Sequence, residues 1–304
     1  MENVIEVEHL RKTYKDLTAV DDVSFTVRRG EIFGLLGRNG AGKTTTVECV
    51  QGLRHATGGT VRVLGLNPAT QAQALRKRIG CQLQESAVPD RAKVWEALSL
   101  FSSLSPRGTD WRKLMSDWGL QEKAKSSFAS LSGGQKQRLF VALALVNEPE
   151  VVFLDEMTTG LDPAARRVAW ELIRQIRARG ATVVLVTHFM DEAEVLCDRL
   201  AIIDSGRVIA IDSPRGLIAA NVPELRVIFS TEVADLGFLN KVEGVTHLEH
   251  NGPRVTVYGR GPVLALVAAS LVEHGLVPAD LRLEEPSLED VFLKLTGLAA
   301  GTVE

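Results

Sequence analysis

The stretch GLLGRNGAGKTTT, Gly34–Thr46, decides how the rest of the chain is interpreted. It combines four glycines, one lysine and three threonines directly after the start of a short apolar run. Glycine loses more backbone freedom on folding than any other residue, so glycines at this density indicate a loop with special backbone geometry. Residues 37–44, GRNGAGKT, match the pattern G-x-x-x-x-G-K-[ST] of a phosphate-binding loop.

The residues of this loop have distinct expected roles. Glycines let backbone N–H groups turn inward around phosphate oxygens, and the following helix directs its positive end at the same phosphates. Lys43 would bridge the β and γ phosphates of a nucleotide, and Thr44 would offer a hydroxyl oxygen to Mg²⁺. The strand before the loop and the helix after it favour nucleotide binding over a glycine-rich turn that binds nothing. The residues expected to hold the phosphates are Gly37, Arg38, Asn39, Gly40, Ala41, Gly42, Lys43, Thr44 and Thr45.

Composition and charge restrict the class of protein. The chain has 304 residues, 45% of them hydrophobic and 24% charged, as in globular proteins generally. The net charge of −3 gives no basic field, so no nucleic-acid partner is expected. Cys49, Cys81 and Cys197 lack metal-ligand or CxxC spacing, which is typical of a reduced cytosolic chain. The longest apolar run, residues 263–272, is too short to cross a bilayer.

Apolar runs predict an α/β architecture for the first part of the chain. VVFLDE, residues 151–156, and TVVLVTH, residues 182–188, are continuous runs of the kind found in parallel strands covered on both faces. Helical segments lie between the strands, and residues 72–121 read as mostly helical. We expect this domain to cover residues 1–220.

The pattern changes after about residue 221, where short elements follow one another. A strand, a helical segment at residues 231–242, a hairpin around Asn251-Gly252, a helix, a strand and a final helix are expected in that order. This order fits a small split-βαβ module with an added helix, so residues 221–304 are predicted to form a C-terminal α+β accessory domain.

A second motif identifies the kind of nucleotide-binding protein. LSGGQ, Leu131–Gln135, precedes a helical run and is followed by VVFLDEMTTGLDP. This order of motifs resembles the ABC ATPases, the nucleotide-binding subunits of ATP-binding-cassette transporters, over residues 4–212. The resemblance implies a P-loop core in which a mixed sheet carries an antiparallel β subdomain and a helical subdomain at about residues 85–145. It also implies ATP and Mg²⁺ as cofactors and ATP hydrolysis coupled to transport.

The resemblance assigns roles to single residues around the bound nucleotide. Tyr14 takes the position of the ring that stacks on adenine, and Gln84 that of the glutamine that touches Mg²⁺ and the attacking water. Asp155 would hold Mg²⁺, and Glu156 would polarise the water that attacks the γ-phosphorus. His188 matches the histidine that contacts the γ-phosphate. Lys43, Gln84, Glu156 and His188 are therefore the predicted catalytic residues.

Other motif residues are expected to act on a second copy of the chain. In ABC ATPases the LSGGQ segment contacts the nucleotide bound to the partner, so Ser132, Gly133, Gly134 and Gln135 would complete the partner's site, and Asp162 would cross the same interface. A homodimer of cassettes is the expected assembly, and a pair of two different cassettes is the alternative. The chain departs from the family at Met157, where proline is usual, and only a modest effect on the rate is expected.

The end of the chain narrows the resemblance. PSLEDVFLKLTG, residues 286–297, resembles the daunorubicin-resistance type of ABC ATPase, most of which are exporters that pair with separate membrane subunits. The chain is then a peripheral protein on the cytoplasmic face of the cell membrane. Trp95, Leu98 and Phe101 could form the apolar face that receives the membrane subunit, although their spacing equally fits a helix facing a core.

Two other classes of function remain to be weighed. A soluble ABC ATPase could act on nucleic acid or ribosomes, but the long inserted coiled coil and the tandem cassettes of such proteins are missing from this sequence. A module that senses ATP without turnover is disfavoured because Glu156 is retained.

Overall fold

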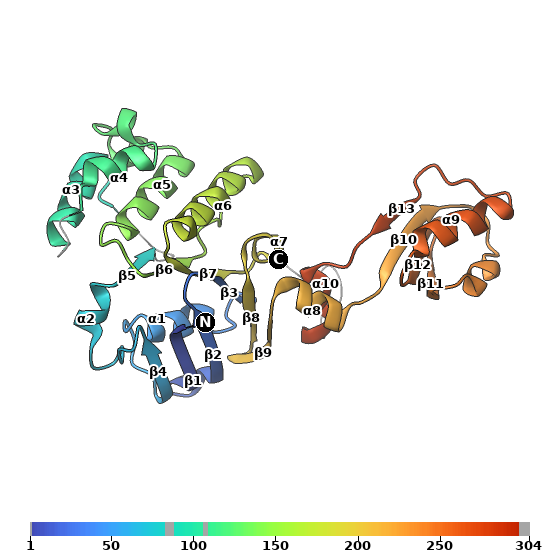
Figure 1. Cartoon of the computed structure of the whole chain (residues 1–304), viewed down its shortest axis with the longest axis horizontal. Coiled ribbons are helices and arrows are strands. Elements are labelled where there is room, and N and C mark those ends of the chain that lie inside the picture. Colours follow the sequence, from blue (N-terminus) through green and yellow to red (C-terminus); the bar gives the residue numbers. More distant parts are fainter. Residues whose placement is uncertain (1, 83–87, 106–108, 298–304) are drawn as a thin grey trace. The chain divides into compact units, whose positions relative to one another are not determined.

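The structure is a computed structural model that describes residues 2–82, 88–105 and 109–297. The chain divides into two compact units, Met1–Pro214 and Arg215–Glu304, and each is described by itself (Figure 1). Within the described residues, the first unit contains a six-stranded and a three-stranded sheet, and the second contains a four-stranded sheet.

The six-stranded sheet forms the centre of the first unit. Across the sheet its strands are β5 (Ile79–Gln82), β6 (Val151–Asp155), β7 (Thr182–Thr187), β3 (Ile32–Leu36), β8 (Arg199–Asp204) and β9 (Arg207–Asp212). Five run parallel and β9 pairs antiparallel with β8, so the sheet is mixed. β3, β6 and β7 are buried along their whole length, as continuous apolar runs predict. The predicted α/β core with a mixed sheet is confirmed.

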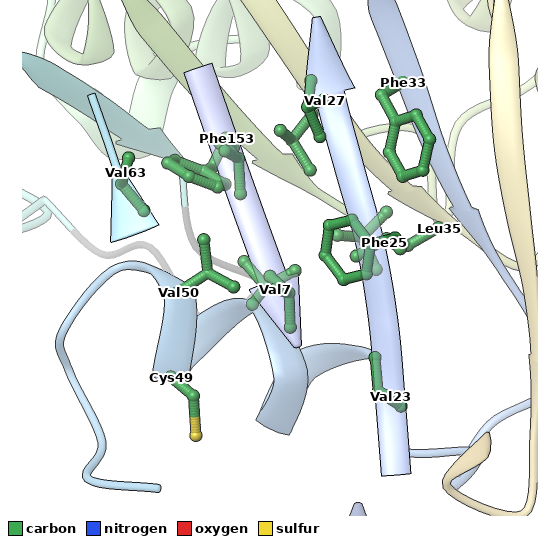
Figure 2. Packing of buried hydrophobic residues seen from close by; sticks show 14 of the residues in the cluster. Val7, Val23, Phe25, Val27, Phe33, Leu35, Cys49, Val50, Val63 and Phe153 are labelled. Carbon is green, nitrogen blue, oxygen red and sulfur yellow. The ribbon is translucent and has the colours of Figure 1, made fainter. Parts of the chain in front are cut away.

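An antiparallel sheet packs against one face of this core sheet. Its strands, in order, are β2 (Leu17–Arg28), β1 (Asn3–Tyr14) and β4 (Gly58–Val63). Alternate side chains of β2 point inward, and the ring of Phe25 stacks on Phe33 of β3 with 5.4 Å between centroids (Figure 2). Helix α1 (Lys43–Val50) contributes Val47 and Val50 to the same hydrophobic cluster, so one core joins both sheets and the helix.

The remaining helices of the first unit surround the sheets. They are α2 (Ala72–Arg76), α3 (Val94–Leu104), α4 (Trp111–Asp117), α5 (Gly133–Ala144), α6 (Pro163–Ala178) and α7 (Met190–Leu196), with short 3₁₀ helices η1 (Gln121–Lys123) and η2 (Phe128–Ser130). In Figure 1, α3, α4 and α5 gather as a group within the first unit. Helix α6 begins at Pro163 and is followed shortly after its end by Gly180, an arrangement common in helices, and it buries Ala169, Leu172, Ile173 and Ile176.

The prediction of mostly helical structure over residues 72–121 is wrong at one point. Residues 79–82 form β5, an edge strand that pairs in parallel with β6. Four residues are too few for a visible alternation, and helices on both sides dominated the pattern. The apolar residues of helix α3 were expected either to face a core or to receive a membrane subunit. Leu98 is fully buried in the core, while Trp95 and Phe101 are partly exposed.

The second unit is an antiparallel sheet with helices. Strand order is β11 (Val245–Asn251), β12 (Arg254–Gly259), β10 (Leu225–Ser230) and β13 (Arg282–Glu284). Helices α8 (Pro214–Asn221), α9 (Val263–Glu273) and α10 (Leu288–Thr296) complete it, α8 starting at the boundary between the units. The predicted hairpin around Asn251-Gly252 is present between β11 and β12. Ser287 caps α10 in a reciprocal capping box with Asp290.

The order of these strands is that of a split βαβ module, but its first helix is reduced. Residues 231–242 were expected to be helical, and only the 3₁₀ helix η3 (Gly237–Lys241) forms there. The Asp235 carboxylate accepts a hydrogen bond from the Gly237 N–H, which stabilises a turn in competition with the helix. The short η3 packs Leu239 into the same cluster as Val267 of α9.

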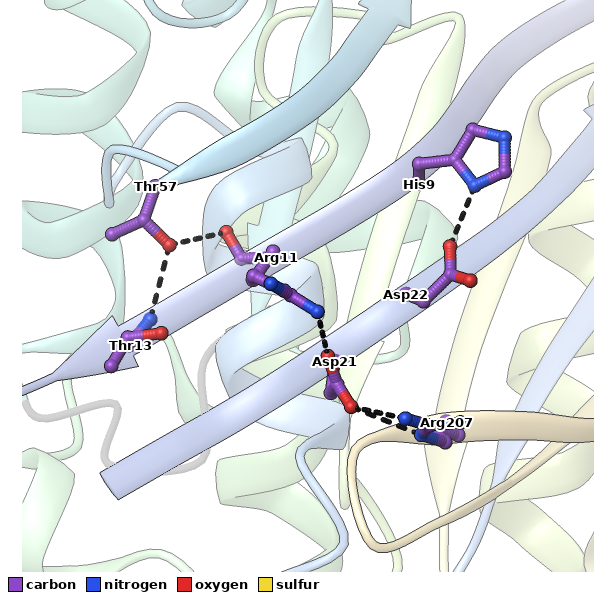
Figure 3. A network of polar contacts seen from close by, with 7 residues as sticks. All are labelled: His9, Arg11, Thr13, Asp21, Asp22, Thr57 and Arg207. Atoms are coloured by element: carbon purple, nitrogen blue, oxygen red, sulfur yellow. Dashed lines mark hydrogen bonds and ion pairs between the residues drawn. The ribbon is translucent and has the colours of Figure 1, made fainter. Parts of the chain in front are cut away.

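A polar network fixes the antiparallel sheet to the β8–β9 turn (Figure 3). The Asp21 carboxylate accepts hydrogen bonds from Arg11 and Arg207, which lower its pKa. The backbone continues the connection, because the Asp21 N–H donates to the Gly206 carbonyl and the Gly206 N–H donates to the Ala41 carbonyl. The glycine-rich loop is therefore held by the turn between β8 and β9.

Candidate functional site

The glycine-rich loop connects β3 to α1 and adopts a conformation that only glycine permits at two places. Gly40 and Gly42 have φ of 81° and 98°. A Cβ on Gly42 would lie 2.4 Å from the Ala19 carbonyl oxygen, and one on Gly37 would lie 2.3 Å from that of Ile203. Because neighbouring backbone lies this close, glycine is required at positions 37 and 42. The first turn of α1, which follows the loop, leaves backbone N–H groups without partners inside the helix.

Lys43 spans the inside of this loop. Its ammonium group donates hydrogen bonds to the carbonyls of Gly37, at 2.8 Å, and Arg38, at 3.0 Å, and lies 3.7 Å from Glu156 Oε1. Burial lowers the pKa of Lys43, while the charges of Glu156 and Asp155 oppose this shift. A cation held here by weak neutral acceptors is available to anionic oxygens that enter the loop.

Asp155 ends β6 beside the start of α1 and is 2% exposed. Burial, together with the neighbouring charge of Glu156, raises the pKa of Asp155 to about 6, although the Thr44 hydroxyl and Lys43 act in the opposite direction. Its Oδ1 atom is buried without a hydrogen-bond partner among the described residues. A carboxylate oxygen without a partner next to a threonine hydroxyl is a donor set that fits a hard divalent cation such as Mg²⁺.

Glu156 and His188 meet at the carboxyl edge of the sheet. Glu156 has φ of 48°, and its N–H donates to the Val186 carbonyl of β7 at 2.9 Å. His188 follows the end of β7, and its Nδ1 lies 3.2 Å from Glu156 Oε1. The uncommon backbone conformation turns the Glu156 side chain from the strand toward Lys43 and His188, so one carboxylate contacts two potential cations.

A pocket of about 520 Å³ opens over the loop. Its lining includes Lys43, Thr44 and Glu156 together with Tyr14 and Arg54. The Tyr14 ring carries two cations near its face, with Lys12 Nζ 4.8 Å and Arg54 Cζ 5.6 Å from its centroid. The remaining lining residues are Leu17, Ala19, Asn39, Gly40, Gly42 and Thr45.

Another hollow of about 560 Å³ lies beside α4 and the C-terminal end of α6, but its charges are already paired. Arg179 and Lys113 both contact the Asp117 carboxylate, at 2.9 and 2.8 Å. The 520 Å³ pocket is the candidate site because its lining includes Glu156, whose backbone conformation is uncommon, and Lys43, whose pKa is lowered by burial.

The LSGGQ residues and Asp162 do not line this pocket. Ser132 is the N-cap of α5, with its hydroxyl accepting from the Gln135 N–H while the Gln135 side chain accepts from the Ser132 N–H. Gly133 follows it at the helix start and is exposed. Asp162 is the exposed N-cap of α6 and accepts from the N–H groups of Ala164 and Ala165. The residues at both helix starts are therefore absent from the lining of the chain's own nucleotide pocket.

Two features of the site lie beyond what local sequence patterns reveal, and one predicted residue is not described. Arg54 lines the pocket although it belongs to no motif, and only its position shortly after α1 could have suggested it. Gln137 donates a hydrogen bond to the carbonyl of Met157, which is buried, and so connects α5 to the segment after Glu156. The predicted site residue Gln84 lies outside the described residues.

Replacement of Asp155 with asparagine should raise stability when no nucleotide or metal is present. A folded pKa near 6 lies above the unfolded value, so the ionised carboxylate destabilises the fold, and the native state regains stability as pH falls through 6 toward 4. Asp155→Asn should therefore be more stable at pH 8, by about 2–3 kcal/mol at most, and the difference should shrink below pH 6.

Urea unfolding between pH 5 and pH 8 measures this difference. Asp16→Asn, which changes an exposed aspartate, is the matched control and should follow the wild type at every pH. A gap between Asp155→Asn and the wild type that stays constant with pH would show that the Asp155 carboxylate is not the source.

No helix among the described residues is both long and apolar enough to span a bilayer.

Comparison with known proteins gives consistent matches. The sequence model of the family described as ABC transporter matches residues 20–159. The chain is 39% identical over 302 residues to the Nod factor export ATP-binding protein I of Ralstonia nicotianae, covering 97% of this chain and 94% of the relative. It is 40% identical to the protein of the same name from Paraburkholderia xenovorans, covering 97% of this chain and 98% of the relative.

Solved structures agree with these matches. A structure described as the ATP binding subunit of an ABC transporter has a TM-score of 0.64 and 30% identity, and the match covers 71% of this chain and 92% of that one. CbiO1 from Clostridium perfringens, described as part of the ABC transporter complex cbiONQ, has a TM-score of 0.63 and 26% identity, with 73% and 97% covered.

Proposed function

The chain belongs to the ATP-binding subunits of ABC transporters, and we propose that it drives export through a separate membrane-spanning subunit. It is an ATPase that binds ATP and couples ATP hydrolysis to transport. The observation that carries the proposal is the position of Glu156 in the pocket over the phosphate-binding loop, where its Oε1 lies 3.7 Å from the Lys43 ammonium group and 3.2 Å from His188 Nδ1. The cassette would comprise residues 1–220, and residues 221–304 an accessory domain.

The proposed chemistry divides the transfer of the γ-phosphoryl group among these side chains. Lys43 gives up its weak carbonyl contacts and binds oxygens of the β and γ phosphates. Glu156 accepts a proton from the attacking water, and His188 orients the Glu156 carboxylate and contacts the γ-phosphate. Thr44 and Asp155 would hold Mg²⁺, whose charge would offset that of the phosphates. Gln84 is proposed to approach the same cation and the water.

The base end of the nucleotide is proposed to stack on Tyr14. The ring belongs to the lining of the pocket, and an aromatic face binds a planar base by stacking. The rest of the phosphate loop would surround the phosphates with backbone N–H groups. The loop residues with this role are Gly37, Arg38, Asn39, Gly40, Ala41, Gly42 and Thr45.

A second cassette is proposed to close each site. Ser132 and Asp162 stand at two exposed helix starts whose N–H groups suit phosphate oxygens. With Gly133, Gly134 and Gln135 they would cover the nucleotide of a partner copy, so that ATP joins two cassettes and its hydrolysis separates them. A symmetric homodimer is the simplest assembly, since the chain supplies both halves of the interface.

The names of the relatives support export, and a location at the membrane is proposed together with it. Those matched over 97% of this chain are named export ATP-binding proteins, which favours export over a soluble ATPase that acts on nucleic acid or ribosomes. The chain would lie on the cytoplasmic face of the cell membrane, attached through its membrane-spanning partner. The exposed Trp95 and Phe101 of α3 are candidates for that contact.

The proposal is tested by measuring Mg·ATP hydrolysis by this chain after co-expression with candidate membrane-spanning transporter subunits of the same genome. We expect hydrolysis to rise several-fold when the chain and its partner subunit are reconstituted in vesicles, because the partner would hold two cassettes together. DNA and ribosomes serve as control additions and should have no effect. Stimulation by either of them, with none by the membrane protein, would contradict the export function.

A further inference from the structure

Gln137, on α5, contacts the backbone next to Glu156, the proposed general base. Its side-chain Nε2 donates a hydrogen bond to the carbonyl of Met157, the residue that follows Glu156. Met157 is buried, whereas Gln137 is partly exposed and is not among the residues that line the nucleotide pocket in the described part of the chain. The hydrogen bond therefore joins α5 to the backbone beside Glu156 from outside the pocket.

The segment that follows Glu156 forms two tight turns of its own. The Glu156 carbonyl accepts a hydrogen bond from the Thr159 N–H at 3.2 Å, and the Thr158 carbonyl accepts one from the Leu161 N–H at 3.2 Å. Both of these bonds stay within the segment. The carbonyl between them, that of Met157, instead accepts from a side chain of α5, so this one contact ties the turns to another element of the fold.

Glu156 needs such contacts because its backbone conformation is uncommon. Its φ of 48° lies in the left-handed region, which a residue other than glycine keeps only when the surrounding structure maintains it. On one side, the Glu156 N–H donates to the Val186 carbonyl of β7 at 2.9 Å. On the other side, the Gln137 amide holds the carbonyl of the next residue. Together the two contacts fix the direction of a carboxylate that lies 3.7 Å from Lys43 and 3.2 Å from His188.

Helix α5 is a well-fixed anchor for this contact. Ser132 and Gln135 form a reciprocal capping box at its start, and Gln137 follows in the second turn. Further along, the helix buries Leu139, Val141, Ala142 and Ala144. A shift of the Gln137 backbone would therefore require a helix that is packed into a core to move.

We propose that Gln137 is a positioning residue, which orients Glu156 toward the attacking water by holding the Met157 carbonyl. The inference rests on the proposed ATPase function, since Gln137 acts through the Glu156 carboxylate. Loss of the contact would let the Glu156 side chain turn away from its position near Lys43 while the phosphate-binding loop stays intact. A small misplacement of a general base slows the chemical step, so the effect belongs to kcat and not to KM.

The test compares Mg·ATP hydrolysis by the wild-type full chain with that of variants that lose or keep the donor. Gln137→Met has a side chain of similar length without N–H groups, so kcat should fall by about 10-fold to 10²-fold with KM unchanged. Gln137→Glu also lacks the donor and should lose at least as much. Gln137→Lys keeps a donor of similar reach and should recover most of kcat. Gln175→Met, the same replacement at a partly exposed position of α6, is the matched control and should resemble the wild type.

A double variant separates positioning from general loss of structure. If Gln137 acts through Glu156, Gln137→Met should not reduce further the slow hydrolysis that remains in Glu156→Gln. A replacement that only disturbs the fold would lower this residual rate as well. Single-turnover phosphate release measures the residual rate, and thermal unfolding identifies any variant that fails to fold. If Gln137→Met does not fold, the comparison of Gln137→Glu with Gln137→Lys decides.

The outcomes distinguish this inference from the proposed function. A wild-type chain that hydrolyses no Mg·ATP would overturn both. A hydrolysing wild type in which folded Gln137→Met or Gln137→Glu retains its kcat would overturn only the role of Gln137. An equal loss in Gln137→Lys, or a further loss in the double variant, would also contradict positioning through the hydrogen bond. A rise in KM with unchanged kcat would place Gln137 in nucleotide binding instead.

Discussion

Glu156→Gln should abolish steady-state ATP hydrolysis while the protein continues to bind Mg·ATP. The amide has the shape of the carboxylate but does not accept a proton from the attacking water, and general-base catalysis contributes about 10²–10⁴-fold to such rates. Binding should be retained or improved, because the substitution removes a negative charge that lies 3.7 Å from the Lys43 ammonium group. Phosphate release and isothermal titration with Mg·ATP measure the two effects separately.

The same variant also tests the assembly. If each ATP is covered by the helix starts at Ser132 and Asp162 of a second copy, blocked hydrolysis should leave the nucleotide between the copies. Light scattering should then detect a dimer with Mg·ATP and a monomer without it. A chain that remains monomeric with bound ATP at high concentration, alone and with its membrane-spanning partner, would contradict the two-cassette site.

Glu171→Gln is the matched control for these measurements. Glu171 is exposed on α6 and its one ion pair, with Arg174, spans 3.6 Å on the helix surface. Surface pairs of this kind contribute little, so hydrolysis and assembly should be those of the wild type. Turnover at the wild-type rate in Glu156→Gln would show that another group accepts the proton.

Local patterns in the sequence were sufficient for the central sheet and the phosphate-binding loop. Continuous apolar runs predicted β3, β6 and β7, since strands covered on both faces need apolar side chains throughout. The spacing of glycines predicted the loop because Gly37 and Gly42 are required by backbone atoms of β2 and β8 that lie close to them. An apolar run can be recognised from neighbouring residues, and a required glycine can be recognised at a single position.

The features that the sequence patterns did not predict depend on contacts between distant segments of the chain. Strand β5 exists because β6 supplies its hydrogen bonds, and η3 is short because an aspartate side chain competes for the backbone. No spacing in the sequence relates Trp170 to Glu192 or Gln137 to Met157, which are joined only after α5, α6 and α7 pack. Contacts between packed helices are therefore harder to predict than the motif residues at the ends of strands.

Lys43→Met should abolish the recognition of phosphates with little change in the fold. Methionine keeps most of the apolar stem of lysine but removes the ammonium group that now contacts the Gly37 and Arg38 carbonyls. Two opposing effects limit the change in stability: two carbonyls lose a donor, while a cation whose pKa is already lowered by burial no longer has to be desolvated. Thermal unfolding without nucleotide should therefore shift only slightly.

The loss of affinity in Lys43→Met should depend on the number of phosphates in the ligand. This dependence distinguishes a missing cation from general damage to the pocket. Hydrogen bonds to charged groups contribute about 1.5–3 kcal/mol each, so the affinity for Mg·ATP should fall by about 10²-fold or more. The loss should be smaller for ADP and absent for adenosine, which would contact only the part of the pocket lined by Tyr14.

Lys77→Met, at an exposed position after α2, controls for removal of a lysine. An equal loss for adenosine and ATP would mean that the variant damages the whole pocket, and an unchanged affinity for ATP would remove Lys43 from the phosphate site. A loss that grows with each added phosphate is the result that only a cation inside the loop explains, because its attraction acts on phosphate charge and not on the base.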